Sequence, residues 1–285
     1  EHMRRRPIGD LAGALAALDV EVRWEGRPGF PPLTLERRGA PGLGVEVDAA
    51  RSSQFASALL LVAPRLPSGL TVRLRGAAVS RPYLDLTVAA LRAFGARVDE
   101  APGEFRVEPG PLRCARFEVE GDWSSAAFLL AAGRIAGVEV AVPNVRSDSL
   151  QGDRAIIGLL ERLSRPGPRR FDLGDCPDLI APVAAAAAFA DGPTELRNAA
   201  HVRIKESDRL RVLAEGFRAA GIAVEELPDG MVITPYRPAQ GVSGPNEVCP
   251  CEHATGKLTL AHATPDPGPA LTLDPHSDHR MAMAF

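Results

Sequence analysis

Apolar and polar residues along this chain follow two arrangements, and each arrangement occurs several times. In the first, an alanine-rich helix begins at polar residues and leads through a turn to a short apolar strand. In the second, an amphipathic helix leads to a β-hairpin. The best copy of the second has Leu84, Val88, Leu91 and Phe94 at the spacing of one helix face. Strands that alternate with helices predict an α/β protein.

The copies succeed one another along the whole chain. For the first arrangement we expect a helix and a strand at 52–62 and 69–74, at 124–132 and 137–142, and at 178–190 and 193–196. For the second we expect a helix and a strand or hairpin at 6–18 and 20–24, 81–94 and 96–107, 152–163 and 169–173, and 205–220 and 222–234. Together they give repeated β-α-β-α-β-β units of about 55 to 70 residues. Chance similarity among alanine-rich helices is the alternative.

Composition excludes some classes of protein. The chain has 285 residues and a formal net charge of −3, which gives no reason to expect nucleic-acid binding. No apolar run reaches the roughly 18 residues that span a bilayer, and no signal peptide is visible. The four cysteines do not form a disulfide framework in a chain of this length, so we expect a cytoplasmic protein. Cys249 and Cys251 with His253 have tighter spacing than a usual zinc site, so we expect no metal. The other cysteines are Cys114 and Cys176.

Lysine is rare here, with two among 33 basic residues, and Lys205 is one of them. Unlike arginine, a lysine ammonium can lose its proton when its surroundings lower its pKa. Lys205 and Arg209 are four residues apart and would share one face of a helix, with Glu206 close by. Two cations beside a carboxylate suit a small anionic substrate that must be protonated. The alternative is a surface helix with solvated ion pairs.

Unusual polar residues occur at matching places in the repeats. They lie either at the start of the first helix or in the loop that enters the second helix. Helix N-termini attract anions, serine hydroxyls can donate to phosphate, and arginines add bidentate contacts. N-capping is the alternative for Ser52 and Ser53. If the units surround a common axis, one cleft receives Arg6, Ser52, Ser53, Gln54, Ser80, Tyr83, Asp178, Lys205, Glu206, Arg209, His279 and Arg280.

At these residues the chain resembles the EPSP synthase (3-phosphoshikimate 1-carboxyvinyltransferase) family over nearly its whole length. The runs from Arg203 to Arg209 and from Asp278 to Met283 are highly specific together. The other motifs are Arg6-Pro7-Ile8-Gly9, Ser52-Ser53-Gln54-Phe55, Ser80-Arg81-Pro82-Tyr83, Glu120-Gly121-Asp122 with Ser124-Ser125-Ala126, Gln151-Gly152-Asp153, and Pro177-Asp178.

The resemblance implies an enolpyruvyl-transferase fold with two domains of repeated β-α-β-α-β-β units and pseudo-threefold symmetry. Residues 1–119 and 120–285 would form parts of the two domains, with a hinge near residues 118–121. The family transfers the enolpyruvyl group of phosphoenolpyruvate to the 5-hydroxyl of shikimate 3-phosphate on the route to chorismate and aromatic amino acids. The resemblance further implies a monomer without metal or organic cofactor, and without nucleic-acid or membrane partners.

Roles carry over by matching motif. The resemblance implies that Ser52, Ser53 and Ser80 hold the phosphate of shikimate 3-phosphate. Asp178 would contact the shikimate hydroxyls, while Lys205 and Glu206 would handle proton transfer. Burial would have to raise the pKa of Glu206 for it to act as an acid. Either Asp178 or a deprotonated Lys205 would accept the hydroxyl proton. Gln54 and Tyr83 would line the shikimate 3-phosphate side, Arg6, Arg209 and Arg280 would clamp phosphoenolpyruvate, and His279 would lie beside the catalytic groups.

The chain departs from the family pattern in places. Residues matching the family's amino-terminal and carboxy-terminal substrate-binding motifs are not found, so we expect a chain truncated at both ends and inactive or nearly so by itself. Residues 235–275 form a Pro/Gly-rich insertion with His253 and His262, for which we expect a long loop. His201 replaces a substrate-contacting asparagine of some relatives and is a weaker candidate. Trp123 is bulky where relatives have a small residue.

Two other functions stay open. A related enolpyruvyl transferase acts on UDP-N-acetylglucosamine, but it uses a cysteine on a mobile loop, and no cysteine here lies in a matching motif. A non-catalytic fragment that keeps the fold would still bind shikimate 3-phosphate weakly through its serines.

Overall fold

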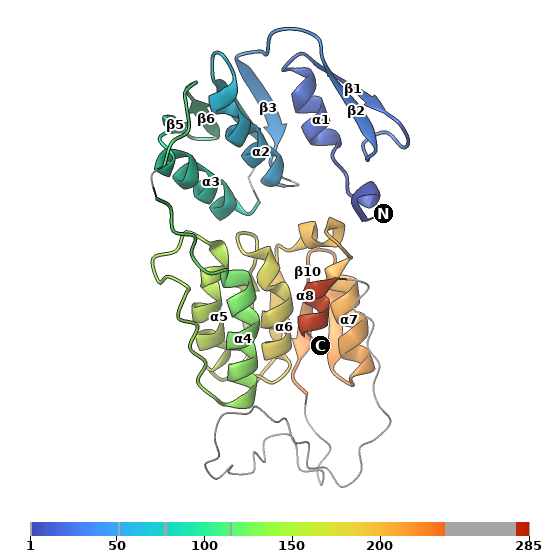
Figure 1. The fold of residues 1–285 in the computed structure, drawn as a ribbon. Coiled ribbons are helices and arrows are strands. Elements are labelled where there is room, and N and C mark those ends of the chain that lie inside the picture. Colours follow the sequence, from blue (N-terminus) through green and yellow to red (C-terminus); the bar gives the residue numbers. More distant parts are fainter. Residues whose placement is uncertain (1, 51, 77–78, 115, 237–277, 285) are drawn as a thin grey trace, which may run out of the picture.

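The chain folds into two halves that lie one above the other, joined by the segment around residue 116 (Figure 1). The structure, a computed structural model, describes residues 2–50, 52–76, 79–114, 116–236 and 278–284. The upper half contains η1 (His2–Arg5), α1 (Gly9–Ala16), β1 (Val20–Trp24), β2 (Leu33–Arg37), β3 (Gly44–Asp48), α2 (Gln54–Val62), η2 (Ala63–Arg65), β4 (Leu70–Arg75), α3 (Arg81–Ala93), β5 (Val98–Ala101) and β6 (Glu104–Val107).

The lower half is larger and is also a mixture of helices and strands. It contains α4 (Trp123–Ala136), η3 (Gly152–Ala155), α5 (Ile156–Leu163), β7 (Arg169–Asp172), η4 (Pro177–Leu179), α6 (Ile180–Ala187), β8 (Thr194–Arg197), η5 (Ala200–Ile204), α7 (Arg209–Ala219), β9 (Ala223–Leu227), β10 (Gly230–Thr234) and α8 (His279–Ala284). The η elements are short 3-10 helices. The predicted α/β class is confirmed.

Each half has one four-stranded mixed sheet, and the two sheets share one strand order. The orders are β3-β4-β6-β5 and β7-β8-β10-β9. In both, the first two strands run parallel and the other pairs run antiparallel. A parallel pair needs a crossover connection, and α2 and α6 with its preceding turn supply it. The strands β1 and β2 form a separate antiparallel pair.

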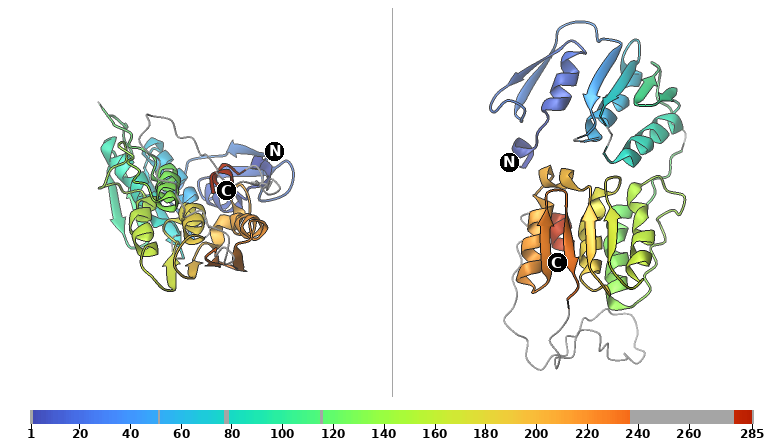
Figure 2. Two further views of the ribbon diagram at one scale, coloured as in Figure 1. Left: turned by 90° about the horizontal axis from the view of Figure 1, so that it is seen from below. Right: turned by 180° about the vertical axis from the view of Figure 1, so that it is seen from behind.

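Helices cover one face of the lower sheet, whose strands come to the front when the molecule is seen from behind (Figure 2). The strand residues accordingly alternate in burial, as in β8 and β3. On α3, Leu84, Val88 and Leu91 are at most 2 % exposed, as their helical spacing predicts. Each half has its own cluster of buried apolar residues, and these two clusters hold the polar loops at the facing ends of the halves.

Caps explain where the key helices begin. The Asp122 carboxylate accepts from the backbone N–H groups of Ser124 and Ser125 at 3.0 and 3.1 Å, so α4 starts there. At its other end, Gly137 takes a left-handed conformation with φ of 68°. Asp208 caps α7 by accepting from the Arg211 N–H at 3.2 Å.

Three expected elements are wrong. Residues 137–142 form no strand, because no other described segment pairs with them, and Val142 instead packs on the lower core. Residues 169–173 form no hairpin, since β7 pairs in parallel with β8. The helix expected at 205–220 begins only at Arg209, after its Asp208 cap, so Lys205 and Arg209 do not share a helix face.

Most of the expected insertion lies outside the described residues. This applies to residues 237–275 and therefore to Cys249, Cys251, His253 and His262. Among the residues that the structure describes, no helix has the length and apolar character needed to cross a membrane. No cluster of potential metal ligands occurs in the described ranges either.

Candidate active site

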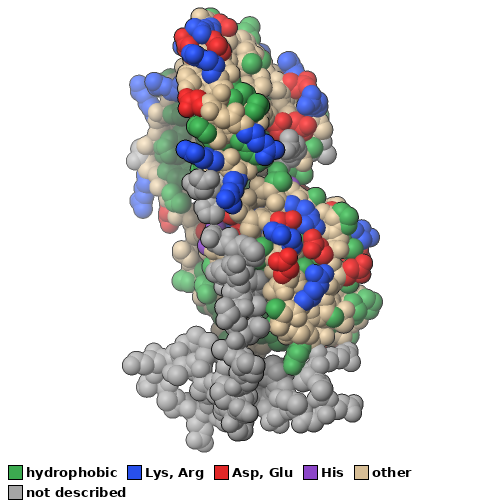
Figure 3. Space-filling model, turned by 90° about the vertical axis from the view of Figure 1, so that its right-hand side faces the viewer, with side chains coloured by type: hydrophobic (Ala, Val, Ile, Leu, Met, Phe, Trp, Pro, Cys, Tyr) green, Lys and Arg blue, Asp and Glu red, His purple; other side chains and the backbone are tan. Residues whose placement is uncertain are grey.

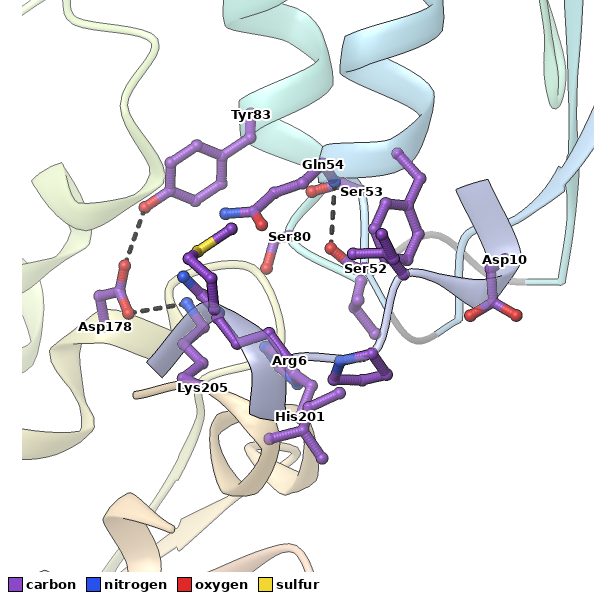
Figure 4. A pocket seen from close by; sticks show the side chains of 16 residues that line it. Arg6, Asp10, Ser52, Ser53, Gln54, Ser80, Tyr83, Asp178, His201 and Lys205 are labelled. Atoms are coloured by element: carbon purple, nitrogen blue, oxygen red, sulfur yellow. Dashed lines mark hydrogen bonds and ion pairs between the residues drawn. The ribbon is translucent and has the colours of Figure 1, made fainter. Parts of the chain in front are cut away.

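A cleft with a cavity of about 230 Å³ lies where the facing ends of the two halves meet. The upper half contributes the segment around Arg6, the start of α2 and the start of α3, and the lower half contributes η4 and the segment after η5. Figure 4 shows these side chains around the cavity. Eight of the predicted site residues line it: Arg6, Ser52, Ser53, Gln54, Ser80, Tyr83, Asp178 and Lys205.

Ser53 and Ser80 form the hydroxyl side of this cleft. Both are buried, at 3 % and 7 % exposed, and each precedes the first residue of a helix. Neither side chain makes a capping hydrogen bond, so the N-capping alternative is wrong for Ser53. It holds in part for Ser52, whose Oγ accepts from the Gln54 N–H at 3.2 Å. The start of α2 thus lies at the cavity with two serine hydroxyls, and the positive end of a helix there favours an anion.

Ser80 is held in an unusual conformation. Its φ of 55° is left-handed, which is uncommon for a residue with a side chain. Its backbone N–H donates to the Gly174 carbonyl of the lower half at 3.0 Å. A contact between the halves therefore stabilises the backbone that aims this serine at the cleft.

Asp178 is the centre of the charged side of the cleft. Its Oδ1 accepts from Lys205 Nζ at 2.9 Å and from Arg209 Nη1 at 2.8 Å, and Arg280 Nη2 lies 3.4 Å from Oδ2. Burial alone would raise the pKa of Asp178, but the charges of Lys205 and Arg280 outweigh burial and hold it well below its usual range. Asp178 is therefore ionised, with three cations gathered around it.

Tyr83 connects the halves at the same carboxylate. Its hydroxyl donates to Asp178 Oδ2 at 3.3 Å, from α3 in the upper half to η4 in the lower half (Figure 4). Burial, followed by the charges of Asp153 and Asp178, raises the pKa of this phenol. Tyr83 therefore stays protonated and can only stabilise Asp178 as a donor.

Arg209 is the most enclosed cation of the site, with a side chain 2 % exposed. Each of its three nitrogens donates to a different carboxylate: Nε to Asp278 and Nη2 to Glu206, at 2.8 and 2.7 Å, besides Nη1 to Asp178. Glu206 is 32 % exposed and its other oxygen lies 3.6 Å from Nη1 of Arg6 in the upper half. Glu206 is thus partly exposed and lies between two guanidinium groups.

The remaining candidates divide into two groups. Glu206, Arg209 and Arg280 contact residues of the cleft without lining the cavity. His279 is exposed at the start of α8 and does not line it. His201, the weaker candidate, does line it, and burial with the nearby charge of Lys205 lowers its pKa to about 4. His201 is therefore neutral at pH 7.

Two further groups of the site carried no predicted role. Asp278 is 1 % exposed, and its Oδ2 accepts from Ser207 as well as from Arg209. It opens the run Asp278 to Met283, so its place before a helix was the available signal. Asp10 also lines the cleft, from α1, where sequence reasoning predicted only an amphipathic helix.

Trp123 is 3 % exposed and packs in the lower core, with Nε1 donating to the Arg146 carbonyl at 3.1 Å.

The cysteines that the structure describes lie elsewhere. Cys114 is exposed and Cys176 is buried, and neither lines the cleft. Burial raises the pKa of the Cys176 thiol to about 12, so it is not a reactive thiolate at neutral pH. Nothing in the described part of the cleft therefore resembles a nucleophilic or acidic thiol site.

Comparison with known proteins agrees with this geometry. Residues 1–285 match the family model of EPSP synthase (3-phosphoshikimate 1-carboxyvinyltransferase). Enzymes of that name from Shewanella loihica and Methanoculleus marisnigri are 37 % and 35 % identical over 99 % of this chain, which spans 64 % of their length. A solved EPSP synthase from Acinetobacter baumannii has the same fold, with a TM-score of 0.66 and 22 % identity over 99 % of this chain and 64 % of that one. This chain belongs to the EPSP synthase family.

Proposed function

We propose that the cleft binds shikimate 3-phosphate and phosphoenolpyruvate and that the protein transfers the enolpyruvyl group to the 5-hydroxyl, releasing phosphate. The observation that carries this proposal is the division of the cleft. One side offers buried serine hydroxyls at a helix start, and the other gathers Lys205, Arg209 and Arg280 around Asp178. A phosphorylated acceptor and an anionic donor need this combination of donors and cations.

The acceptor occupies the serine side in this proposal. Ser52, Ser53 and Ser80 donate to its phosphate, and Gln54 and Tyr83 lie along the sugar ring. Asp178 faces its hydroxyls. A carboxylate whose pKa is held well below its usual range is a weak general base, so Asp178 orients the hydroxyl and holds Lys205 rather than removing the proton by itself.

The donor occupies the arginine side. Arg209 has no nitrogen without a carboxylate partner, so an incoming carboxylate must take the place of one of them. Glu206 is the most exposed of the three and already contacts Arg6. We therefore propose that the carboxylate of phosphoenolpyruvate displaces Glu206 from Arg209. Glu206 is then free to turn to the reacting methylene carbon for proton transfer.

The two halves act as the two domains of the family fold. We propose residues 1–119 and 120–285 as parts of these domains, built of repeated units around pseudo-threefold axes. The equal strand order of the two sheets supports repeated units. Contacts across the cleft, such as Tyr83 with Asp178 and Arg6 with Glu206, support closure of the halves on substrate, which would exclude competing water.

Phosphate release from shikimate 3-phosphate and phosphoenolpyruvate tests the proposal, together with calorimetric titration of shikimate 3-phosphate. In a protein with the full length of these relatives, we expect release to require both substrates and to be lost in Lys205→Ala, whereas the 285-residue chain, which spans 64 % of that length, should bind shikimate 3-phosphate with little or no release. The matched control is Arg211→Ala, an exposed cation on α7. Binding of shikimate 3-phosphate without release in the full-length protein as well would indicate the alternative, a protein that binds without catalysis. A chain that neither binds it nor releases phosphate would contradict the proposal.

A further inference from the structure

A second buried carboxyl group, that of Asp153, lies outside the lining of the cleft. Asp153 lies on η3 and is 2 % exposed. Ser124, itself 6 % exposed on α4, donates its hydroxyl to Asp153 Oδ2. Asp153 Oδ1 has no hydrogen-bond partner among the described residues, although it is fully buried. A buried carboxyl oxygen without a partner is costly and therefore rare unless it has a function.

We propose that Asp153, paired with Ser124, is a positioning residue that supports the Tyr83 phenol from behind and keeps its hydroxyl directed at Asp178. The element η3 packs against α3, α4 and η4, which carry Tyr83, Ser124 and Asp178. The short helix η3, which carries Asp153, thus lies where these three elements meet. The proposal rests on the proposed function only in treating the cleft as a substrate site.

Titratable and polar groups from several elements surround Asp153. The Ser124 hydroxyl on α4 contacts Asp153, and the charge of Asp153 acts on Tyr83 of α3. The charge of Asp178 on η4 raises the pKa of Asp153, whereas the positive charges of Arg280 and Lys205 lower it. Cys176, which precedes η4, is another titratable group nearby.

Figure 3 shows another face of the molecule, where charged side chains of both signs lie over both halves.

These surroundings oppose ionisation of Asp153. Burial raises its pKa to about 6, and the negative charge of Asp178 adds to this, while the hydrogen bond from Ser124 acts in the opposite direction. Asp178 is ionised throughout the neutral range, so of these two carboxyl groups only Asp153 changes its charge near neutral pH. When Asp153 ionises, a second negative charge besides that of Asp178 disfavours the phenolate, so Tyr83 keeps its proton and remains a hydrogen-bond donor to Asp178.

Nuclear magnetic resonance of the 285-residue chain labelled with [ζ-¹³C]tyrosine tests this without substrate. The chain has only two tyrosines, Tyr83 and Tyr236, and Tyr83→Phe assigns their signals. Between pH 5 and 8 we expect the Tyr83 signal to shift with a single midpoint near pH 6. The shift should vanish in Asp153→Asn, which keeps the shape and an acceptor. It should persist in Asp175→Asn, an exposed aspartate in the same loop region.

A second variant tests the pairing with the serine. Ser124→Ala removes the hydrogen bond that stabilises the ionised form, so the midpoint should move to higher pH. A flat Tyr83 signal in the wild type, an inflection that survives in Asp153→Asn, or an unchanged midpoint in Ser124→Ala would each overturn the proposal. A chain that binds no shikimate 3-phosphate would contradict the proposed function, whereas the Tyr83 titration would still decide the role of Asp153.

Discussion

Replacing Asp153 with asparagine should raise the free energy of unfolding relative to wild type, and this gain should be larger at alkaline than at acidic pH. The native state raises the pKa of Asp153 from 3.8 to about 6, so folding favours its protonated form. Its contribution to stability is therefore present at low pH and is lost as the pH rises from about 4 to 6. The unfolding free energy lost through ionisation of Asp153 is about 3 kcal/mol at pH 8 and about 1 kcal/mol at pH 4.5. Asparagine does not titrate and escapes this loss.

Urea unfolding at pH 4.5 and pH 8 measures the effect. The difference in unfolding free energy between Asp153→Asn and wild type should rise by about 2 kcal/mol from the lower to the higher pH. Comparing two pH values removes any constant cost of burying the amide. Asp175→Asn, at an exposed site, should change this difference by less than about 0.5 kcal/mol. Parallel stability curves for wild type and Asp153→Asn would refute the reasoning.

Other expected outcomes concern packing and the buried ion pairs. A Cβ on Gly152 would lie 2.5 Å from the Asp175 carbonyl oxygen, so Gly152→Ala should lower the unfolding free energy by about 1–3 kcal/mol, measured by urea unfolding. Gly158→Ala, at an exposed position of α5 where a Cβ meets nothing within 4 Å, should raise it by about 0.5–1 kcal/mol; equal effects at the two glycines would contradict the close packing around η3. Asp278→Asn should cost about 3 kcal/mol at pH 6, because it removes one of the two buried carboxylates that pair with Arg209. Burial alone would raise the pKa of Asp278, but Arg209 holds it below its usual range, so this cost should shrink as the pH falls below about 4; a cost independent of pH would show that the ion pair is not its source.

The order of helices and strands was largely readable from the sequence because apolar spacing reports which face of an element is buried. The spacing of Leu84, Val88 and Leu91 predicted α3, and the same reasoning predicted β9 and β10. It failed at residues 137–142, because strand formation depends on a partner strand and not only on local apolar content. Parallel pairing of β7 was likewise invisible, since it joins β7 to a strand that lies beyond a helix.

The candidate site was predictable as a set of residues but not as a set of contacts. Motifs identified Asp178, Lys205 and Arg209, and the structure brings all three together. Lys205 and Arg209 do not lie on one helix, however, because Lys205 precedes the start of α7 at Arg209. Sequence could not show that Arg209 has a carboxylate on each nitrogen, because Asp278 is distant in the chain. The Asp153 arrangement was hidden for the same reason: burial and proximity to Tyr83 arise only when η3 packs against α3.

Calorimetric titration of the chain with shikimate 3-phosphate tests most directly the claim that the serine side of the cleft binds a phosphorylated acceptor. We predict one site, with affinity reduced about 10- to 100-fold in Ser53→Ala, since a hydrogen bond to a charged group contributes about 1.5–3 kcal/mol. Ser68→Ala, an exposed serine outside the lining of the cleft, is the matched control and should bind as wild type does. Absence of binding, or equal affinities of wild type and Ser53→Ala, would contradict the account.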